Sequence, residues 1–266
     1  MAEDPLAGFE PKEYRLLGQT RTVLRAGEGP AVVVMHEIPG ITPEVAGFAR
    51  RVAEAGYSVF LPDLFGTPGK PFGLPYVAEQ MVRACISREF HVLASHRASP
   101  ITDWLRALCC EAHAECGGPG VGAIGMCLTG NFALALMVDP CVMAPVLSQP
   151  SLPFGITPSQ RAALHVSEEQ LETIRKRARN GCPVLGMRFT RDPMVPPERF
   201  ETLRRELGPE GFEGIEIDSS PGNPHGIPRT AHSVVTTDLV DEAGHPTRAA
   251  LDRVLAFFAE QLRPAA

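Results

Sequence analysis

The chain has 266 residues, of which 44% are hydrophobic, and this is enough for the core of one large α/β domain over residues 1–266. Its formal net charge of -6 comes with no basic block that could follow a phosphate backbone, which argues against nucleic-acid binding. The N-terminus lacks the basic and apolar regions of a signal peptide, and no run approaches the ~18 apolar residues of a membrane span. We therefore expect a cytoplasmic protein without membrane contact.

The seven cysteines are an odd number without the spacing of a disulfide framework, and in a reducing compartment we expect free thiols. Cys109, Cys110, His113 and Cys116 cluster, yet they follow a helical pattern and lack two paired Cys-x-x-Cys units. We therefore expect these residues to pack in a core rather than to bind zinc. The sequence predicts neither a metal nor another cofactor.

The first part of the chain alternates strand and helix patterns. Residues 13–26 alternate as in a hairpin, and residues 31–35 are the continuous apolar run of a strand buried on both faces. A capped helix follows over residues 42–56, and then a strand over residues 58–61. A strand, helix, strand unit of this kind predicts two neighbouring parallel strands.

Residues 67–100 form a longer connection, which is rich in Pro and Gly at first and helical over residues 77–93. Arg83 and Arg88 lie in this helical stretch. A connection of such length is typical of a segment with a function of its own, and we expect it to cover part of the functional site. A helix with one apolar stripe follows over residues 101–112.

Residues 122–137 predict a short buried strand that breaks sharply into a helix at Cys127. Further strands are predicted at residues 142–147, 183–189 and 214–218, and helices at residues 167–180, 200–207 and 251–262. This alternation predicts an α/β fold with a mostly parallel, twisted sheet and helices on both faces.

The break at Cys127 has the features of a nucleophile elbow. Gly125 lies two residues before the cysteine and Gly130 three residues after it, whereas the usual pattern has its second glycine where Thr129 stands. A thiol at such a break faces the free amides of the new helix, and their positive field favours the thiolate. The alternative is a buried structural cysteine in a connection between strand and helix.

Three residue types follow the carboxyl ends of successive strands in the order nucleophile, acid, histidine, which is the chain order of the α/β-hydrolase triad. They are Cys127, Asp192 and His232. The thiolate would attack a carbonyl, the imidazole would manage the proton, and the carboxylate would orient the imidazole. The backbone amides of Leu128 and Ile38 are the expected oxyanion donors.

Two of these assignments have alternatives. Asp192 could instead cap the short helix that begins near Pro196, and His225 competes with His232 as the base. The Asn-Pro-His-Gly context of His225 is typical of a turn, so we prefer His232.

Five motifs together resemble the dienelactone hydrolase family, over residues 30–262. They are Val-Val-Val-Met-His-Glu-Ile-Pro-Gly, Phe-Leu-Pro-Asp-Leu-Phe-Gly, Gly-Met-Cys-Leu-Thr-Gly, Arg-Asp-Pro-Met-Val-Pro and Ala-His-Ser-Val. The resemblance implies an α/β-hydrolase fold with a cysteine nucleophile. It also implies that Glu37 contacts the resting cysteine and helps deliver the thiolate, although Glu37 could also be an exposed loop carboxylate.

The chain departs from the family pattern at two threonines. Thr129 replaces a glycine, and Thr236 stands where dienelactone-cleaving members have an arginine four residues after the catalytic histidine. A second family arginine could correspond to Arg83 or Arg88. We therefore expect a cofactor-free hydrolase of small esters or lactones that works through an acyl-cysteine as a monomer or homodimer. The alternatives are a broad carboxylesterase or thioesterase, and a catalytically silent binding protein.

Overall fold

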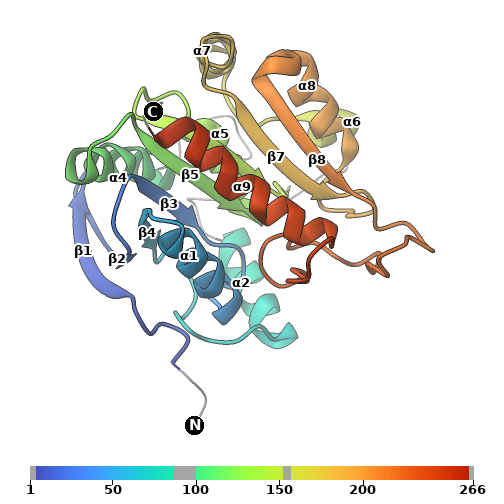
Figure 1. Ribbon diagram of the computed structural model, residues 1–266, viewed down its shortest axis with the longest axis horizontal. Helices are drawn as coiled ribbons and strands as arrows, with labels where there is room; N and C mark the ends of the chain where they lie inside the picture. The colour runs from blue at the N-terminus through green and yellow to red at the C-terminus, as the bar shows by residue number, and fades with distance from the viewer. Residues whose placement is uncertain (1–3, 87–99, 152–156, 264–266) are drawn as a thin grey trace.

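One eight-stranded sheet organises the molecule. The structure is a computed structural model that describes residues 4–86, 100–151 and 157–263, with the side chains of residues 81–86 excepted. The strands lie in the order β1-β2-β4-β3-β5-β6-β7-β8 (Figure 1). Their bounds are β1 Glu10–Leu16, β2 Gln19–Ala26, β3 Ala31–Met35, β4 Ser58–Pro62, β5 Val121–Met126, β6 Val142–Ser148, β7 Val184–Phe189 and β8 Phe212–Ile217. Neighbours from β4 to β8 pair in parallel, and β1 and β2 add an antiparallel hairpin, so the predicted fold class is confirmed.

Helices cover both faces of this sheet. They are α1 Pro43–Glu54, α2 Leu74–Ile86, α4 Pro100–Cys116, α5 Gly130–Leu136, α6 Pro158–Ala162, α7 Glu168–Arg179, α8 Pro197–Gly211 and α9 Pro246–Leu262. Figure 1 shows α1 and α9 on the same face, where Phe48 and Phe258 belong to one apolar cluster. The second cluster contains Trp104 of α4, Phe132 of α5 and Phe200 of α8. Two separate apolar layers thus enclose the sheet.

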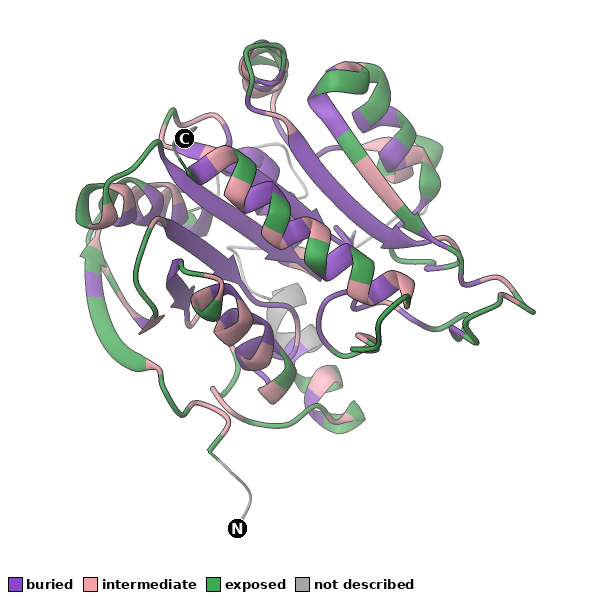
Figure 2. Cartoon of the chain, in the orientation of Figure 1, coloured by how far each residue is buried: buried purple, intermediate pink, exposed green. Residues whose placement is uncertain are grey.

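The central strands are buried throughout, as their continuous apolar sequences predict (Figure 2). All five residues of β3 and all six of β5 are buried. A Cβ atom at Gly122 of β5 would lie 2.9 Å from the Phe258 ring, so this glycine lets α9 pack directly on the strand. The carboxyl ends of β3, β5, β6 and β7 therefore meet at one edge of a rigid sheet.

One expected segment differs in detail from the structure. The helix expected over residues 77–93 begins earlier, at Leu74, and residues 87–99 of the expected cover lie outside the described residues. Another short helix, α6, begins at Pro158. There Thr157 and Gln160 form a reciprocal capping box, which stabilises the first turn of that helix. In the described part of the chain, no helix combines the length and the apolar character that crossing a membrane needs.

Candidate active site

Cys127 lies at a sharp break between strand and helix, as the sequence predicts. Strand β5 ends at Met126, residues Cys127–Thr129 form the 3₁₀ turn η1, and α5 begins at Gly130. The backbone of Cys127 has a φ angle of 55°, in the left-handed region that residues other than glycine rarely adopt. Such a conformation persists where the surrounding structure imposes it, and it occurs most often at functional sites.

Close backbone packing explains the two glycines of this elbow. A Cβ atom at Gly125 would lie 2.1 Å from the carbonyl oxygen of Thr129, and one at Gly130 would lie 2.7 Å from Pro150 Cα. Thr129 itself has a φ angle of -77°, which any residue adopts without strain. The chain therefore needs glycine at position 130 and can carry a side chain at position 129.

The side chain of Thr129 ties the elbow to the neighbouring strand. Its hydroxyl oxygen is buried and lies 2.9 Å from the carbonyl oxygen of Met35, the last residue of β3. The same oxygen accepts a hydrogen bond of 2.9 Å from the backbone N–H of Met126. The threonine that departs from the expected glycine thus stabilises the elbow by polar contacts on both sides.

Asp192 and His232 form a short, buried hydrogen bond. His232 Nδ1 lies 2.5 Å from Asp192 Oδ2, and Asp192 is only 3% exposed. The other carboxylate oxygen of Asp192 accepts the N–H of Met194, whereas the N-cap of α8 is Pro196, so Asp192 does not cap that helix. Nε2 of His232 is buried and has no hydrogen-bond partner among the residues described. Asp192 therefore orients the ring through Nδ1.

The charges around His232 favour its protonated form. Burial by itself would lower the pKa of His232 from its ordinary value of 6.5. The negative charge of the Cys127 sulfur and the hydrogen bond to Asp192 outweigh this effect and hold the pKa of His232 well above that value. The cysteine is thus close enough for its charge to act on the imidazole of His232.

His225, the competing candidate, lies elsewhere. It is exposed, and its ring packs edge-on against His245 with 5.3 Å between the ring centroids. Of the two histidines, the structure brings His232 to Asp192.

The sulfur of Cys127 has a neighbour that the sequence analysis did not single out. Ser151 Oγ lies 3.2 Å from Cys127 Sγ, and both residues are buried, with Cys127 8% exposed. Ser151 follows β6 in the segment Ser148-Gln-Pro-Ser151. The sequence could have indicated Ser151, because it is a polar residue just past the carboxyl end of a parallel strand, and such ends meet at the same edge of the sheet.

Glu37 is buried and its carboxylate is fully engaged by three side chains. Oε2 accepts hydrogen bonds from the hydroxyl of Ser233 at 2.7 Å and from the amide of Gln149 at 3.1 Å. Oε1 accepts a hydrogen bond from the hydroxyl of Thr236. Glu37 is therefore not an exposed loop residue. The contact with resting Cys127 that the resemblance implies is also not formed, because these donors, two of which follow His232 in the chain, hold both carboxylate oxygens.

His36 fixes the backbone of Glu37. Its Nε2 accepts a hydrogen bond of 3.1 Å from the N–H of Leu64, so Nδ1 carries the proton and donates to the carbonyl oxygen of Glu37 at 3.1 Å. Burial lowers the pKa of His36 to about 4, which keeps the ring neutral at physiological pH. The loop after β3 is thus joined to the segment after β4.

The two expected oxyanion donors follow adjacent strands. Leu128 lies in the first turn after Cys127, where backbone N–H groups have no acceptor within the helix. Ile38 lies in the loop after β3, and β3 pairs in parallel with β5 up to Met35 and Gly125. The side chain of Arg83 and the whole of Arg88, expected as substrate contacts, lie outside the described residues.

The expected cysteine cluster on α4 is divided between core and surface. Cys109 is buried, Cys110 Sγ lies 3.3 Å from Cys141 Sγ, and His113 Nε2 contacts the carbonyl oxygen of Gly118. Within the described residues, no three His, Cys, Asp or Glu side chains are placed to hold a metal ion.

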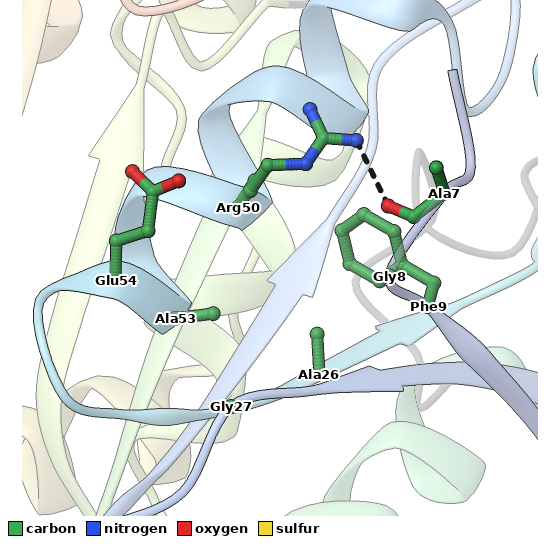
Figure 3. A pocket seen from close by; sticks show the side chains of 8 residues that line it. All are labelled: Ala7, Gly8, Phe9, Ala26, Gly27, Arg50, Ala53 and Glu54. Carbon is green, nitrogen blue, oxygen red and sulfur yellow. Dashed lines mark hydrogen bonds between the residues drawn. The ribbon is translucent and has the colours of Figure 1, made fainter. Parts of the chain in front are cut away.

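A hollow of about 290 Å³ lies between the end of β2 and helix α1 (Figure 3). Its lining residues are Ala7, Gly8, Phe9, Ala26, Gly27, Arg50, Ala53 and Glu54. Arg50 donates a hydrogen bond of 3.2 Å to the carbonyl oxygen of Ala7 across it. Because none of these residues belongs to the group around Cys127, the hollow is a separate feature.

The mostly parallel sheet, the helices on both faces and the elbow after β5 together define an α/β-hydrolase fold. A sequence model of the dienelactone hydrolase family matches residues 19–262, nearly the whole chain. The protein therefore belongs to this family and is a carboxylic ester hydrolase.

Individual relatives are distant. A protein of Saccharomyces cerevisiae named "Putative carboxymethylenebutenolidase" is 26% identical over 193 residues, which are 71% of this chain and 67% of the yeast protein. Among solved structures, a dienelactone hydrolase-like promiscuous phosphotriesterase from metagenomic libraries has a TM-score of 0.61 and 18% identity, covering 96% of this chain and 98% of its own. Carboxyl esterase 2 from Tuber melanosporum has a TM-score of 0.56 and 16% identity, with 97% and 89% covered. At these identities the two structures show the shared fold.

Proposed function

We propose that the protein hydrolyses small esters or lactones through an acyl-cysteine intermediate on Cys127. His232 serves as general base and acid, and Asp192 orients it. The observation that carries the proposal is the 2.5 Å hydrogen bond from Asp192 to Nδ1 of a ring whose Nε2 has no partner among the described residues. Such a bond selects the tautomer or charge state in which Nε2 exchanges a proton with the nucleophile and the leaving group.

The reaction has two halves. The Cys127 sulfur bonds to the substrate carbonyl carbon, and the carbonyl π electrons move to oxygen, where the N–H groups of Leu128 and Ile38 stabilise the negative charge. As the carbonyl re-forms, the bond to the leaving oxygen breaks and that oxygen takes a proton from His232. Water then gives a proton to His232 and attacks the thioester, and the cysteine sulfur leaves as thiolate. The scheme needs no cofactor and no macromolecular partner.

Glu37 is a positioning residue in this scheme. Its hydrogen bonds to Ser233 and Thr236 join the loop after β3 to the loop that carries His232. The same contacts bear on the substrate, because the hydroxyl of Thr236 replaces the arginine expected at this position and is used by Glu37. We therefore favour a substrate without a carboxylate at that end, whereas an acidic substrate would need Arg83 or Arg88.

A broad carboxylesterase or a thioesterase would use the same site, since the first half of the reaction differs only in the leaving group. We further propose that the protein acts in the cytoplasm as a monomer or homodimer, because a reducing environment keeps Cys127 as a thiol.

The test is a panel of activated esters, lactones and thioesters with the wild type and Cys127→Ala. We expect turnover of esters or lactones that iodoacetamide abolishes and that Cys127→Ala lowers by several orders of magnitude. Turnover that survives alkylation of Cys127 would contradict an acyl-cysteine. No turnover of any substrate, with the thiol still reactive, would indicate a catalytically silent binding protein.

A further inference from the structure

We propose that Ser151 is a further catalytic residue, whose hydroxyl donates a hydrogen bond to the Cys127 thiolate, and that Asn131 and Arg199 hold it there. The inference rests on the proposed role of Cys127 as the nucleophile. Ser151 Oγ lies 3.2 Å from Cys127 Sγ and, within the described part of the chain, has no other hydrogen-bond partner. Once the sulfur has lost its proton, only the hydroxyl can be the donor. A hydrogen bond to an ionised acceptor is about twice as strong as one between neutral groups.

The backbone of Ser151 is tied to the elbow on both sides. Its N–H donates a hydrogen bond of 3.0 Å to the carbonyl oxygen of Cys127. Its carbonyl oxygen accepts a hydrogen bond of 2.8 Å from Asn131 Nδ2, near the start of α5. All three polar groups of Ser151 thus face the elbow, which restricts the hydroxyl to the neighbourhood of the sulfur.

Arg199 of α8 sets the orientation of this arrangement. The residue is only 1% exposed, and its Nη1 donates to Asn131 Oδ1 at 2.9 Å and to the carbonyl oxygen of Pro150 at 2.7 Å. Because Asn131 Oδ1 accepts from Arg199, its NH₂ group must point to Ser151. Its Nε donates to the carbonyl oxygen of Ala163 at 3.0 Å. A cation that meets three neutral acceptors, and no carboxylate among the described residues, is costly to bury. Burial accordingly lowers the pKa of Arg199 to about 9.

The hydroxyl acts wherever negative charge resides on sulfur. It stabilises the resting thiolate, and its hydrogen bond weakens as the sulfur electron pair forms the bond to the carbonyl carbon. When the thioester is hydrolysed, the departing sulfur recovers this hydrogen bond. No proton leaves Ser151 in either half, so the residue changes the charge distribution and not the proton balance.

The pH dependence of Cys127 alkylation by iodoacetamide tests the proposal, with the Cys127 peptide followed by mass spectrometry. In Ser151→Ala we expect the midpoint to move up by about one pH unit, with about tenfold slower alkylation below it. The plateau rate at high pH should stay equal or rise, because a less stabilised thiolate is the better nucleophile. Ser151→Thr keeps the hydroxyl and should retain most of the wild-type profile.

Matched variants separate this effect from loss of a buried hydroxyl in general. Thr202→Ala is the control, because it removes another buried hydroxyl, on α8, that donates to the carbonyl oxygen of Glu198 and not to Cys127. It should leave the alkylation profile unchanged. Arg199→Met should move the midpoint in the same direction as Ser151→Ala, and combining the two should add no further shift. Ser151→Gly also lacks the hydroxyl, so the decision does not depend on the folding of one variant.

The two proposals fail in different ways. If the profiles of Ser151→Ala and Ser151→Gly coincide with that of the wild type while Cys127→Ala abolishes turnover, Ser151 has no catalytic role and the acyl-cysteine mechanism stands. If the midpoint moves as expected but the wild type turns over no substrate, the contact with the thiolate stands and the proposed function fails.

Discussion

Ser233, the residue next to His232, donates a hydrogen bond of 2.7 Å from its hydroxyl to Glu37 Oε2. This bond joins two loops that follow strands at the carboxyl edge of the sheet, and both residues are buried. Thr236 reinforces the connection at the other carboxylate oxygen. Glu37 thereby holds the loop that carries His232 through Ser233 and Thr236, and it does not contact Cys127.

The change Glu37→Gln keeps the shape of the side chain and replaces one acceptor oxygen with a donor. We expect a folded protein whose kcat falls by roughly tenfold to a hundredfold, because small displacements of a catalytic group are costly. KM should change little, since Glu37 does not face the substrate in the proposed scheme. Steady-state kinetics with thermal melts measure this. Glu44→Gln, an exposed carboxylate on α1, is the control, and an unchanged kcat in Glu37→Gln would remove Glu37 from the mechanism.

Cys127 should be the first cysteine to be alkylated. Burial raises the pKa of Cys182 and of Cys109, and it raises the pKa of Cys141 to about 12, so these thiols are poor nucleophiles at neutral pH. Cys127 instead combines the elbow with a neighbouring imidazole. Brief substoichiometric labelling followed by peptide mass spectrometry tests this order. Preferential labelling of exposed Cys110 would count against an activated Cys127.

The two histidines should differ sharply. His232→Ala removes the ring that Asp192 orients and should lower kcat about as much as Cys127→Ala does, since members of a triad act as a unit. His225→Ala alters an exposed loop ring and should change kcat by less than about tenfold. Parallel kinetics of both variants decide the matter. A larger loss in His225→Ala would transfer the role of base to that residue.

The protonation of His232 should depend on Cys127. The charge of the sulfur and the hydrogen bond to Asp192 raise the pKa of His232 well above 6.5, so the imidazolium should persist to higher pH than in a free histidine. Cys127→Ala removes the sulfur charge, and the pKa of His232 should therefore fall. Ring nitrogen chemical shifts, followed by NMR across pH 5 to 10, measure both proteins. The same pKa in the two would mean that the cysteine and the histidine are not electrostatically coupled.

Short-range patterns were enough to predict the scaffold and the elbow. Apolar runs such as residues 31–35 specify strands buried on both faces, and the spacing of Gly125 and Gly130 around Cys127 matches backbone approaches that exclude a Cβ. These features follow from local sterics and from burial, which a linear sequence displays directly. Cys127, Asp192 and His232 likewise follow strands β5, β7 and β8 along the chain, so their order could be recognised from the sequence.

Tertiary structure decided the contacts around these residues. Glu37 and Ser233 are 196 residues apart in sequence, and their hydrogen bond depends on how two loops pack at the edge of the sheet. In the sequence, Thr129 is a departure from the glycine pattern. Only its hydrogen bond to the carbonyl oxygen of Met35 shows that the hydroxyl stabilises the elbow. No sequence motif indicated a role for Ser151. Periodicity and spacing determine which backbone conformations form, whereas the partners of a buried polar side chain depend on chain segments brought together only when the sheet is complete.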